Sequence, residues 1–372
     1  MRVLHFVSSL SLNSGVMAVI MNYYRHIDRN KIQFDFIHFD DMASNKTYQD
    51  EIALLGGKTY LISKPSLSLS SLRDIINFFN CHDGEFAIIH IHEVYLTFLL
   101  APISHKHGIR VITHCHSTRF SEKFFSATRN RLLCLGINYM TDSRLACSKQ
   151  AGVFLYGSHA NFSVINNAIE INKFLFSPFK RNKIRRSLAI DDKIVIGHVG
   201  RLNKSKNHKF IIEIFNIFHH YYKNSILLLV GDGPELYEIK DQIKSCDLDS
   251  CVHCLGMRAD VADIYNAMDL FLFPSLFEGL GIALIEAQVN GIPCLASSCI
   301  PSEVDIGGVE FISLKQSAEY WSQKIIESLL SIQQTGSRLY NIRTQEYDIK
   351  FMSHKLENEY FKLLSYKIND RV

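Results

Sequence analysis

The sequence predicts an α/β protein made of two doubly wound, Rossmann-like domains that face each other across a cleft. Short apolar runs typical of strands alternate with helical stretches along the chain, as in parallel sheets covered by helices. The chain has 372 residues, which is more than one hydrophobic core usually organises. A basic, polar stretch near the middle, INKFLFSPFKRNKIRRSLAIDDK, breaks the alternation and marks the boundary near residue 175.

Each predicted domain has about six strands, a usual size for one sheet. In the first domain, over residues 1–175, the candidate strands are RVLHFV, FDFIHF, KTYLI, FAIIHIH, RVITHC, LACS and FSVIN. In the second domain, over residues 176–350, they are IVIGHVG, ILLLVGDG, VHCLG, LFLFP and IPCLAS. Residues 351–372 begin with apolar residues at helical spacing, so we expect a C-terminal helix that packs back on the first domain.

Composition and charge disfavour several classes of function. The net charge of +3 is too small to indicate nucleic-acid binding. No apolar run approaches the ~20 residues of a membrane-spanning helix, and the first residues, MRVLHFVSSL, do not resemble a signal peptide. The nine cysteines show no disulfide framework, which indicates a reducing cytoplasm. For the lone C-x-x-C pair, Cys251 and Cys254, we expect buried side chains rather than zinc or redox chemistry.

Two glutamates around a strand-to-helix turn form the most informative motif. Glu278 and Glu286 bracket the segment FEGLGIALIE, which follows the apolar run LFLFP. Gly279 and Gly281 precede a helix whose free N–H groups and dipole favour an anion. Two carboxylates beside an anion site fit the hydroxyls of a sugar and a ribose on either side of a diphosphate. The alternative is a loop acid followed by an acid on a helix surface.

A second group of charges follows the first strand of the second domain, in GHVGRLNKSKNHKF. Arg201 can bind a diphosphate through two hydrogen bonds, and Lys206 acts as a point charge. A solvated basic loop is the alternative. Asn207 is the expected N-cap of a helix that buries Phe210, Ile211, Ile214, Phe215 and Phe218.

Other strand ends carry weaker signals. GDGP, residues 231–234, follows a strand and can be a simple turn, while Met257 and Arg258 can line the edge of a base pocket. In the first domain, Gly15 follows the first strand. A glycine there lets a backbone approach a phosphate closely, although a tight turn would also require one.

Two pairs of histidines end strands of the first domain, His90 with His92 and His114 with His116. Alternate residues of a strand share a face, so each pair is presented together. A metal site is one interpretation, but no carboxylate or H-E-x-x-H pattern accompanies the pairs. We favour a hydrogen bond from a strand-end histidine to a hydroxyl or carbonyl of the substrate.

The segment STRFSEKFFSATRNRLL mixes basic and aromatic residues at helical spacing. Such a helix suits the surface of an anionic membrane, although a solvated face over a small core carries the same pattern. The basic residues are Arg119, Lys123, Arg129 and Arg131, and the aromatic residues are Phe120, Phe124 and Phe125.

The motifs GRLNKSKNH, GDGP, FPSLFEGLGIALIEAQ and NNAIE resemble those of a family 4 retaining glycosyltransferase of the GT-B fold. MNYYRHID, THCHST, IGHVGR and FPSLFEGL are similar to phrases of the bacterial capsule and exopolysaccharide branch. The resemblance covers nearly the whole chain. One departure lies in the first loop, which commonly reads Gly-Gly-Val-Glu in this branch. Here it reads Ser14-Gly15-Val16-Met17, so the polar contact of that acid is missing.

The resemblance implies a role for each candidate residue. Arg201 and Lys206 would bind the diphosphate and stabilise the leaving nucleotide. Glu286 would hold the ribose hydroxyls, and Glu278 would lie beside the transferred sugar. His116, or His114 if the register differs by two, would touch the donor sugar at the reacting face. The remaining donor contacts would come from Gly15, Arg258, Leu280, Gly281, Ile282 and Ala283.

The implied activity is retaining transfer of a hexose from a nucleotide sugar, with UDP as the nucleotide, to a hydroxyl of a lipid-linked or growing polysaccharide acceptor. The resemblance implies no cofactor and no metal. The enzyme would be cytoplasmic, with peripheral contact to the inner face of the plasma membrane, and would bind no nucleic acid. Two alternatives share the architecture, a nucleotide-sugar epimerase or hydrolase and an inactive nucleotide-sugar binding module. A dehydrogenase is disfavoured because G-x-G-x-x-G does not follow the first strand.

Overall fold

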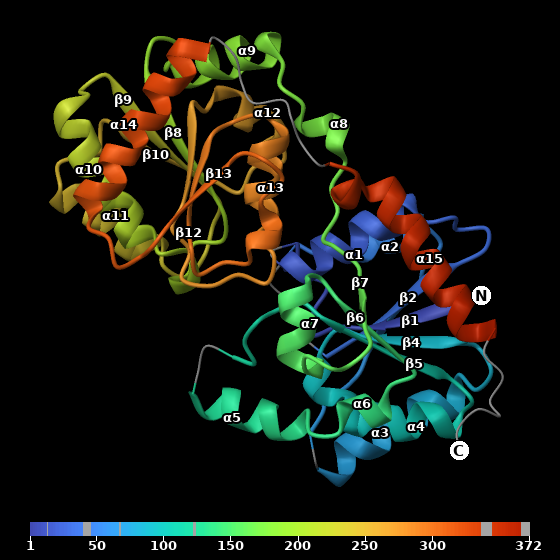
Figure 1. Ribbon diagram of the computed structural model, residues 1–372. Helices are drawn as coiled ribbons and strands as arrows, with labels where there is room; N and C mark the ends of the chain where they lie inside the picture. Colours follow the sequence, from blue (N-terminus) through green and yellow to red (C-terminus); the bar gives the residue numbers. More distant parts are fainter. Residues whose placement is uncertain (13, 40–45, 67, 122–123, 336–343, 366–372) are drawn as a thin grey trace. The chain divides into compact units, whose positions relative to one another are not determined.

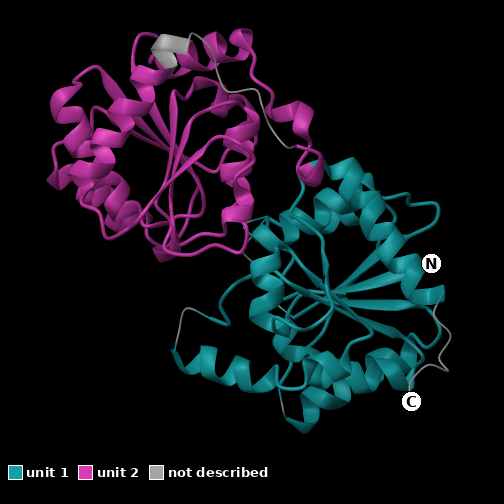
Figure 2. Ribbon diagram, in the orientation of Figure 1, with its two compact units in different colours: residues 1–168, 348–372 teal, residues 169–347 magenta. Residues whose placement is uncertain are grey.

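The computed structural model describes residues 1–12, 14–39, 46–66, 68–121, 124–335 and 344–365 (Figure 1). The chain divides into two compact units (Figure 2). Unit 1 comprises residues 1–168 and 348–372, and unit 2 comprises residues 169–347. Each unit has one parallel sheet between layers of helices, so the prediction of two doubly wound α/β domains is confirmed.

Seven parallel strands form the sheet of unit 1, in the order β3-β2-β1-β4-β5-β6-β7. Every strand overlaps a run predicted from the sequence. The order reverses between β1 and β4, and ligands of doubly wound sheets bind at such a switch point, beyond the carboxyl ends of the strands. The strands are β1 Arg2–Phe6, β2 Gln33–His38, β3 Thr59–Leu61, β4 Ile88–Ile91, β5 Arg110–Cys115, β6 Ser143–Ala146 and β7 Ser163–Val164.

Helices cover both faces of this sheet, with α1 and α15 over one face and α3, α4 and α6 over the other (Figure 1). The C-terminal helix α15 belongs to unit 1. The hydroxyl of Tyr360 lies 2.7 Å from Nδ1 of His90, and Glu357 accepts the backbone N–H of Asp28 at 2.7 Å. The helices are α1 Gly15–His26, α2 Gln49–Leu54, α3 Leu69–Cys81, α4 Thr97–Lys106, α5 Phe124–Leu133, α6 Ile137–Met140, α7 Lys149–Tyr156 and α15 Ile349–Ser365.

The alternation of residues along each strand decides which helices a side chain meets. In β1, Leu4 and Phe6 join a hydrophobic core with Phe79 of α3 and Leu100 of α4. His5 lies between them in the sequence and therefore faces the opposite side of the sheet. There it lines a small cavity together with side chains of α1 and α15.

Six parallel strands form the sheet of unit 2, in the order β10-β9-β8-β11-β12-β13. Five were predicted, and β13 was missed. Its sequence VEFI contains the exposed Glu310, and only Ile312 is buried at this edge of the sheet, so its apolar signal is weak. The order reverses between β8 and β11. The strands are β8 Ile194–Val199, β9 Ser225–Val230, β10 Val252–Gly256, β11 Leu270–Phe273, β12 Cys294–Ser297 and β13 Val309–Ile312.

Helices also lie on both faces of the second sheet, with α10, α11 and α14 over one face and α12 and α13 over the other (Figure 1). The amphipathic helix α10 buries Ile211, Ile214, Phe215 and Phe218 as predicted, whereas Phe210 is half-buried. The helices are α8 Ile171–Phe174, α9 Pro178–Leu188, α10 His208–Tyr221, α11 Leu236–Ser245, α12 Val261–Ile264, α13 Ile282–Val289 and α14 Ala318–Thr335.

The basic stretch predicted at the domain boundary forms α8 and α9. Arg181 and Arg185 of α9 form ion pairs with Asp269 at 2.5 and 2.6 Å. The carboxylate of Asp269 also accepts the backbone N–H of Val195 at the start of β8. These ion pairs hold α9 against the rest of unit 2. Two positive charges of the basic stretch therefore have a structural role and do not indicate a ligand.

Candidate active site

The loops after β8 and β11 meet at the switch point of the second sheet. The backbone N–H of Leu276 donates to the carbonyl of Ser205 at 2.8 Å. The side-chain amide of Asn207 donates to the carbonyl of Pro274 at 3.2 Å. Asn207 precedes α10, but its backbone is left-handed at φ 59° and no side-chain capping bond is present. Asn207 is therefore the N-cap residue of α10 as predicted, but its side chain joins the two loops instead of capping the helix.

Lys206 and Glu278 lie together because these loops are joined. The Nζ atom of Lys206 is 2.5 Å from Oε1 of Glu278, and the two side chains are 15% and 11% exposed. The same Nζ atom lies 5.0 Å from the ring centroid of Phe273, at the end of β11. A cation and a carboxylate thus stand at the point where a doubly wound sheet binds its ligand.

Arg201 lies in the loop after β8 and is exposed. The GDGP turn shapes this loop: Leu202 donates its N–H to the carbonyl of Asp232 at 3.0 Å, and Glu235 donates to the carbonyl of Leu202 at 3.0 Å. Gly231 has φ +137°, and a Cβ atom there would lie 2.0 Å from the carbonyl oxygen of Gly200. GDGP is therefore a turn that positions the loop of Arg201.

The turn into α13 presents its first amides at the same switch point. Gly281 precedes the helix in a left-handed conformation, at φ +85°, which favours glycine. Leu280 is buried, whereas Ile282 and Ala283 are half-buried. Because the first N–H groups of a helix lack intrahelical acceptors and carry the positive end of the dipole, the turn favours an anion.

Glu286 lies one turn into α13 and is held by a tyrosine. The hydroxyl of Tyr265 is 2.8 Å from Oε2 of Glu286 and 3.0 Å from the carbonyl of Ala283. Burial raises the pKa of Glu286 to about 7, and the bond from Tyr265 opposes that rise. Sequence reasoning missed Tyr265, since no motif or spacing in IYNAMDL marks it. Tyr265 can be recognised as a site residue only from the structure, in which it lies next to α13.

Arg258 follows β10, the edge strand of the sheet. It is exposed and forms an ion pair with Asp260, with N···O distances of 2.8 and 2.7 Å. Strands β9 and β8 lie between β10 and the switch point. The structure thus brings Lys206, Glu278 and the start of α13 together, while Arg258 is placed at the margin.

In unit 1, Gly15 is the first residue of α1. Ser14 caps this helix by accepting the N–H of Met17 at 3.3 Å, and Met17 itself is fully buried. Ser14 and Met17 are the two residues that differ from the common Gly-Gly-Val-Glu loop. In this chain they supply a helix cap and a core side chain. A Cβ atom at Gly15 would meet nothing within 4 Å, so packing within the chain does not require a glycine here.

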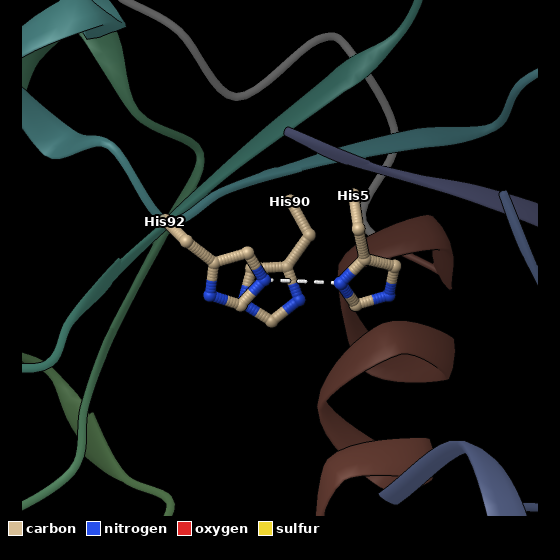
Figure 3. A group of neighbouring side chains, drawn as sticks. All are labelled: His5, His90 and His92. Carbon is tan, nitrogen blue, oxygen red and sulfur yellow. Dashed lines mark hydrogen bonds between the residues drawn. The ribbon is translucent and has the colours of Figure 1, made fainter. Parts of the chain in front are cut away.

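The predicted histidine pairs join into one cluster that also contains His5. Figure 3 shows three of its members, His5, His90 and His92. His92 contacts His5 at 3.0 Å and His116 at 2.8 Å, and His90 contacts His114 at 3.2 Å. Burial lowers the pKa of every ring, to about 3 for His5 and about 4 for His116. Sequence reasoning missed His5, although its position in RVLHFV places it on the same face. The rings expected to meet a substrate thus contact one another.

The basic and aromatic segment forms a strongly exposed surface around α5. Phe124 and Phe125 are 78% and 87% exposed. Arg119, Arg129 and Arg131 are exposed as well, whereas Phe120 is half-buried against Phe154. Lys123 lies outside the described residues. None of the described helices has the length and apolar character needed to cross a bilayer.

Of the two cysteines of the C-x-x-C pair, Cys251 immediately precedes strand β10 and Cys254 lies within it. Cys251 is buried, and its thiol donates to the carbonyl of Leu248 at 3.4 Å. Cys254 is half-buried, and burial raises the pKa of both thiols. Thiols with raised pKa values are poor nucleophiles and poor metal ligands at neutral pH.

Comparisons with known proteins point to one class of enzyme. The profile of the family described as "Glycosyl transferases group 1" matches residues 180–337. The chain is 31% identical over 342 residues to the putative glycosyltransferase EpsF of Bacillus subtilis, covering 87% of this chain and 86% of EpsF. It is 30% identical over 184 residues to an Escherichia coli UDP-Gal:alpha-D-GlcNAc-diphosphoundecaprenol alpha-1,3-galactosyltransferase, covering 48% and 46% of the two chains.

Solved structures share the fold. HepE of Anabaena, crystallised with UDP and glucose, superposes with a TM-score of 0.81 at 20% identity, covering 98% of this chain and all of HepE. Sucrose-phosphate synthase of Thermosynechococcus elongatus superposes with a TM-score of 0.76 at 14% identity, covering 98% and 99% of the two chains.

Proposed function

Because the chain belongs to the glycosyl transferases group 1 family, we propose that it transfers a hexose from a UDP-sugar to a hydroxyl of a lipid-linked or growing polysaccharide. Within that family we assign it to the retaining family 4, in the branch that builds capsules and exopolysaccharides. The name of the Escherichia coli relative, which includes UDP-Gal and a diphosphoundecaprenol acceptor, supports this choice. The UDP bound in the HepE crystal structure supports the same nucleotide.

The observation that carries the proposal is the pairing of Lys206 with Glu278 beside the start of α13. A partly buried ion pair contributes little to stability, because the Coulomb attraction is largely offset by the loss of hydration. Such a pair is better explained as a prepared site: Glu278 holds the ammonium group of Lys206 where the donor phosphate binds. Glu286 lies one helical turn after the start of α13, where in this proposal it accepts the ribose hydroxyls.

The chemistry follows from this placement. The bond between C1 of the sugar and the oxygen of the distal phosphate breaks, and its electron pair stays on that oxygen. Arg201, Lys206 and the amides of Ile282 and Ala283 stabilise the charge that develops there. The acceptor hydroxyl attacks C1 from the face that the phosphate leaves, so the configuration is retained. Its proton passes to the departing phosphate.

Two further groups act on the sugar. Glu278 positions the sugar and stabilises the oxocarbenium-like centre at C1. His116 of unit 1 donates a hydrogen bond to the donor sugar. In this proposal the protein's own cations supply the charge that a divalent metal supplies in other glycosyltransferases, so turnover needs no added metal.

The α5 surface supports a membrane-associated acceptor. Exposed phenylalanines beside exposed arginines suit the headgroup region of an anionic bilayer, where apolar rings insert and guanidinium groups meet phosphates. A lipid-linked acceptor would be presented at that surface, on the cytoplasmic face of the plasma membrane.

The decisive experiment incubates the full chain with a panel of radiolabelled nucleotide sugars and membrane extract of a polysaccharide-producing bacterium. We expect label to enter the lipid fraction from one UDP-sugar, in EDTA as well as in buffer, and an α-linked product from an α-linked donor. An epimerase or hydrolase would convert the donor without any acceptor. A binding module would bind the nucleotide and transfer no label. Either result would overturn the proposal.

A further inference from the structure

The histidines of unit 1 form two hydrogen-bonded rows at the switch point between β1 and β4. They face the same side of the sheet because they occupy alternate positions of adjacent strands. Each row ends at a histidine near the carboxyl end of β5, after which we name it. The His116 row consists of His5, His92 and His116, and the His114 row consists of Tyr360, His90 and His114.

The rings of the His116 row meet edge to edge. Nδ1 of His5 lies 3.0 Å from Nε2 of His92 (Figure 3), and Nδ1 of His92 lies 2.8 Å from Nε2 of His116. The ring planes of these two pairs differ by 13° and 28°, and the ring centroids are 5.3 and 5.0 Å apart. The nitrogens are therefore at hydrogen-bond distance, and each contact joins one N–H to one nitrogen without a hydrogen.

Each ring of the His116 row carries a single hydrogen on its nitrogens. Burial lowers the pKa of His5 to about 3 and that of His116 to about 4, and it lowers the pKa of His92 well below its usual value. A neutral imidazole has one N–H donor and one nitrogen acceptor. Fixing the hydrogen of one ring therefore fixes those of the other two. The row has two states, with Nδ1–H in all three rings or Nε2–H in all three.

The two ends of the His116 row decide between these states. Nε2 of His5 and Nδ1 of His116 are both buried without a hydrogen-bond partner among the described residues. The ring of His5 lies against Phe34 and Phe36, at centroid distances of 4.0 and 5.4 Å, so an N–H at its Nε2 would point at no acceptor. Buried polar groups are rarely left unpaired. The state with Nδ1–H in all three rings places the free N–H at His116, where a bound substrate can accept it.

The His114 row is fixed by a tyrosine of α15. The hydroxyl of Tyr360 lies 2.7 Å from Nδ1 of His90, and burial raises the pKa of this hydroxyl well above its usual value, so it keeps its hydrogen. Because Nδ1 of His90 is the acceptor within reach, Nε2 of His90 carries the ring hydrogen and donates to Nδ1 of His114 at 3.2 Å. His114 is thereby an Nε2–H ring. The two rows thus hold their last histidines in opposite tautomers.

We propose that His5 and His92 are positioning residues of the transfer reaction, which hold His116 in the Nδ1–H form so that this N–H donates to the donor sugar. The inference rests on the proposed function, in which His116 contacts that sugar. The hydrogen bond at one ring nitrogen of a histidine sets which nitrogen carries the hydrogen. A ring without such a partner would exchange its hydrogen between both nitrogens and rotate, and only part of the molecules would present a donor. The row removes that loss by preorganising the contact.

The tautomers can be measured without any substrate. Long-range ¹H–¹⁵N correlation spectra of the full chain, labelled with ¹⁵N-histidine, distinguish Nδ1–H from Nε2–H rings, and the H116N spectrum identifies the signals of His116. We expect His116 to be Nδ1–H in the wild type. In H92F, whose ring has a similar size but no nitrogen, we expect a mixture of both forms. An Nε2–H form or a mixture in the wild type would overturn the proposal, as would an unchanged Nδ1–H form in folded H92F.

Steady-state kinetics with the identified UDP-sugar test the consequence for transfer. H92F should lower kcat by about tenfold or more, the scale of one misplaced hydrogen-bond donor. H92N keeps an N–H at the position of Nδ1 and should recover most of this loss, whereas H92Q, whose amide lies at the position of Nε2, should not. H159N removes an exposed histidine outside the rows and should match the wild type.

The outcomes separate this inference from the proposed function. Equal rates of folded H92F, H92N and H92Q would show that His92 acts only by packing, and an active wild type with that result refutes the inference alone. A wild type that transfers no sugar refutes the proposed function itself, while the spectra still report which nitrogen of His116 carries the hydrogen.

Discussion

Nζ of Lys206 lies 2.5 Å from Oε1 of Glu278, although the two residues are 72 positions apart in the chain. The contact exists because β8 and β11 are neighbours in the sheet and the loops that follow them are hydrogen-bonded to each other. It places a fixed cation next to a fixed carboxylate at the expected position of a diphosphate sugar.

Loss of either partner should therefore slow turnover more than it lowers stability. K206A and E278A should each reduce kcat by about 10²-fold, the scale of one preorganised charge contact. Steady-state kinetics with the identified UDP-sugar measures this effect. K209A, which removes an exposed lysine of α10, serves as the matched control. Near wild-type rates in both K206A and E278A would remove these residues from the mechanism.

Donor binding should depend on the ionisation of Glu286. Its pKa is raised to about 7 by burial, so a carboxylate able to accept ribose hydroxyls forms only as the pH rises through 7. We expect KM for the donor to fall between pH 6 and pH 8. E286Q should flatten this profile, and Y265F should move it to higher pH because the carboxylate loses a hydrogen bond. A profile identical in E286Q and wild type would contradict the assignment.

Ionisation of Glu286 should also affect the stability of the fold. Stability should fall as the pH rises, whereas donor binding should become tighter. The folded-state pKa of Glu286 lies above its usual value of 4.5, so the folded protein retains a proton that the unfolded chain releases. Stability is fully present below pH 4.5 and declines as the pH rises toward 7, by at most about 1.4 kcal/mol per pH unit. Denaturant unfolding of wild type and E286Q across this range should show the variant gaining relative stability at pH 7.

Gly281 and Gly15 should respond differently to alanine. G281A forces a residue with a Cβ atom into a left-handed conformation, which costs about 1 kcal/mol, equivalent to a Tm lower by roughly 2–4 °C. G15A meets open space and should leave Tm unchanged. If the donor phosphate approaches the backbone at Gly15, G15A should nonetheless raise KM. An unchanged KM in G15A would show that the loop does not contact the donor.

The α5 surface should bind anionic vesicles in a salt-dependent manner. Replacing both Phe124 and Phe125 by serine removes two exposed rings, so partitioning should fall by about tenfold or more. Flotation with phosphatidylglycerol vesicles at low and high salt measures this. F179S removes a ring of equal exposure, 78%, from α9 of unit 2 and is the matched control. Equal flotation of F124S/F125S and F179S would count against a membrane role for α5.

Much of this protein can be predicted from its residue order. The alternation of apolar runs and helical stretches predicted the two α/β domains, and the predicted strands include every strand except β13, whose four residues carry an exposed glutamate at a sheet edge. Local motifs predicted the turn into α13 and the charged loop after β8. These features depend on interactions between residues that are close in the sequence, so periodicity and spacing predict them.

Other features were decided only by tertiary structure, because they depend on which strands become neighbours. The pairing of Lys206 with Glu278 follows from the adjacency of β8 and β11. The bond between Tyr265 and Glu286 follows from the packing of the short 3-10 helix Tyr265–Ala267 against α13. His5 joins the other histidines because β1 lies next to β4. Sequence spacing carries no record of these contacts, since strand order in a parallel sheet is set by the crossover connections of the whole domain.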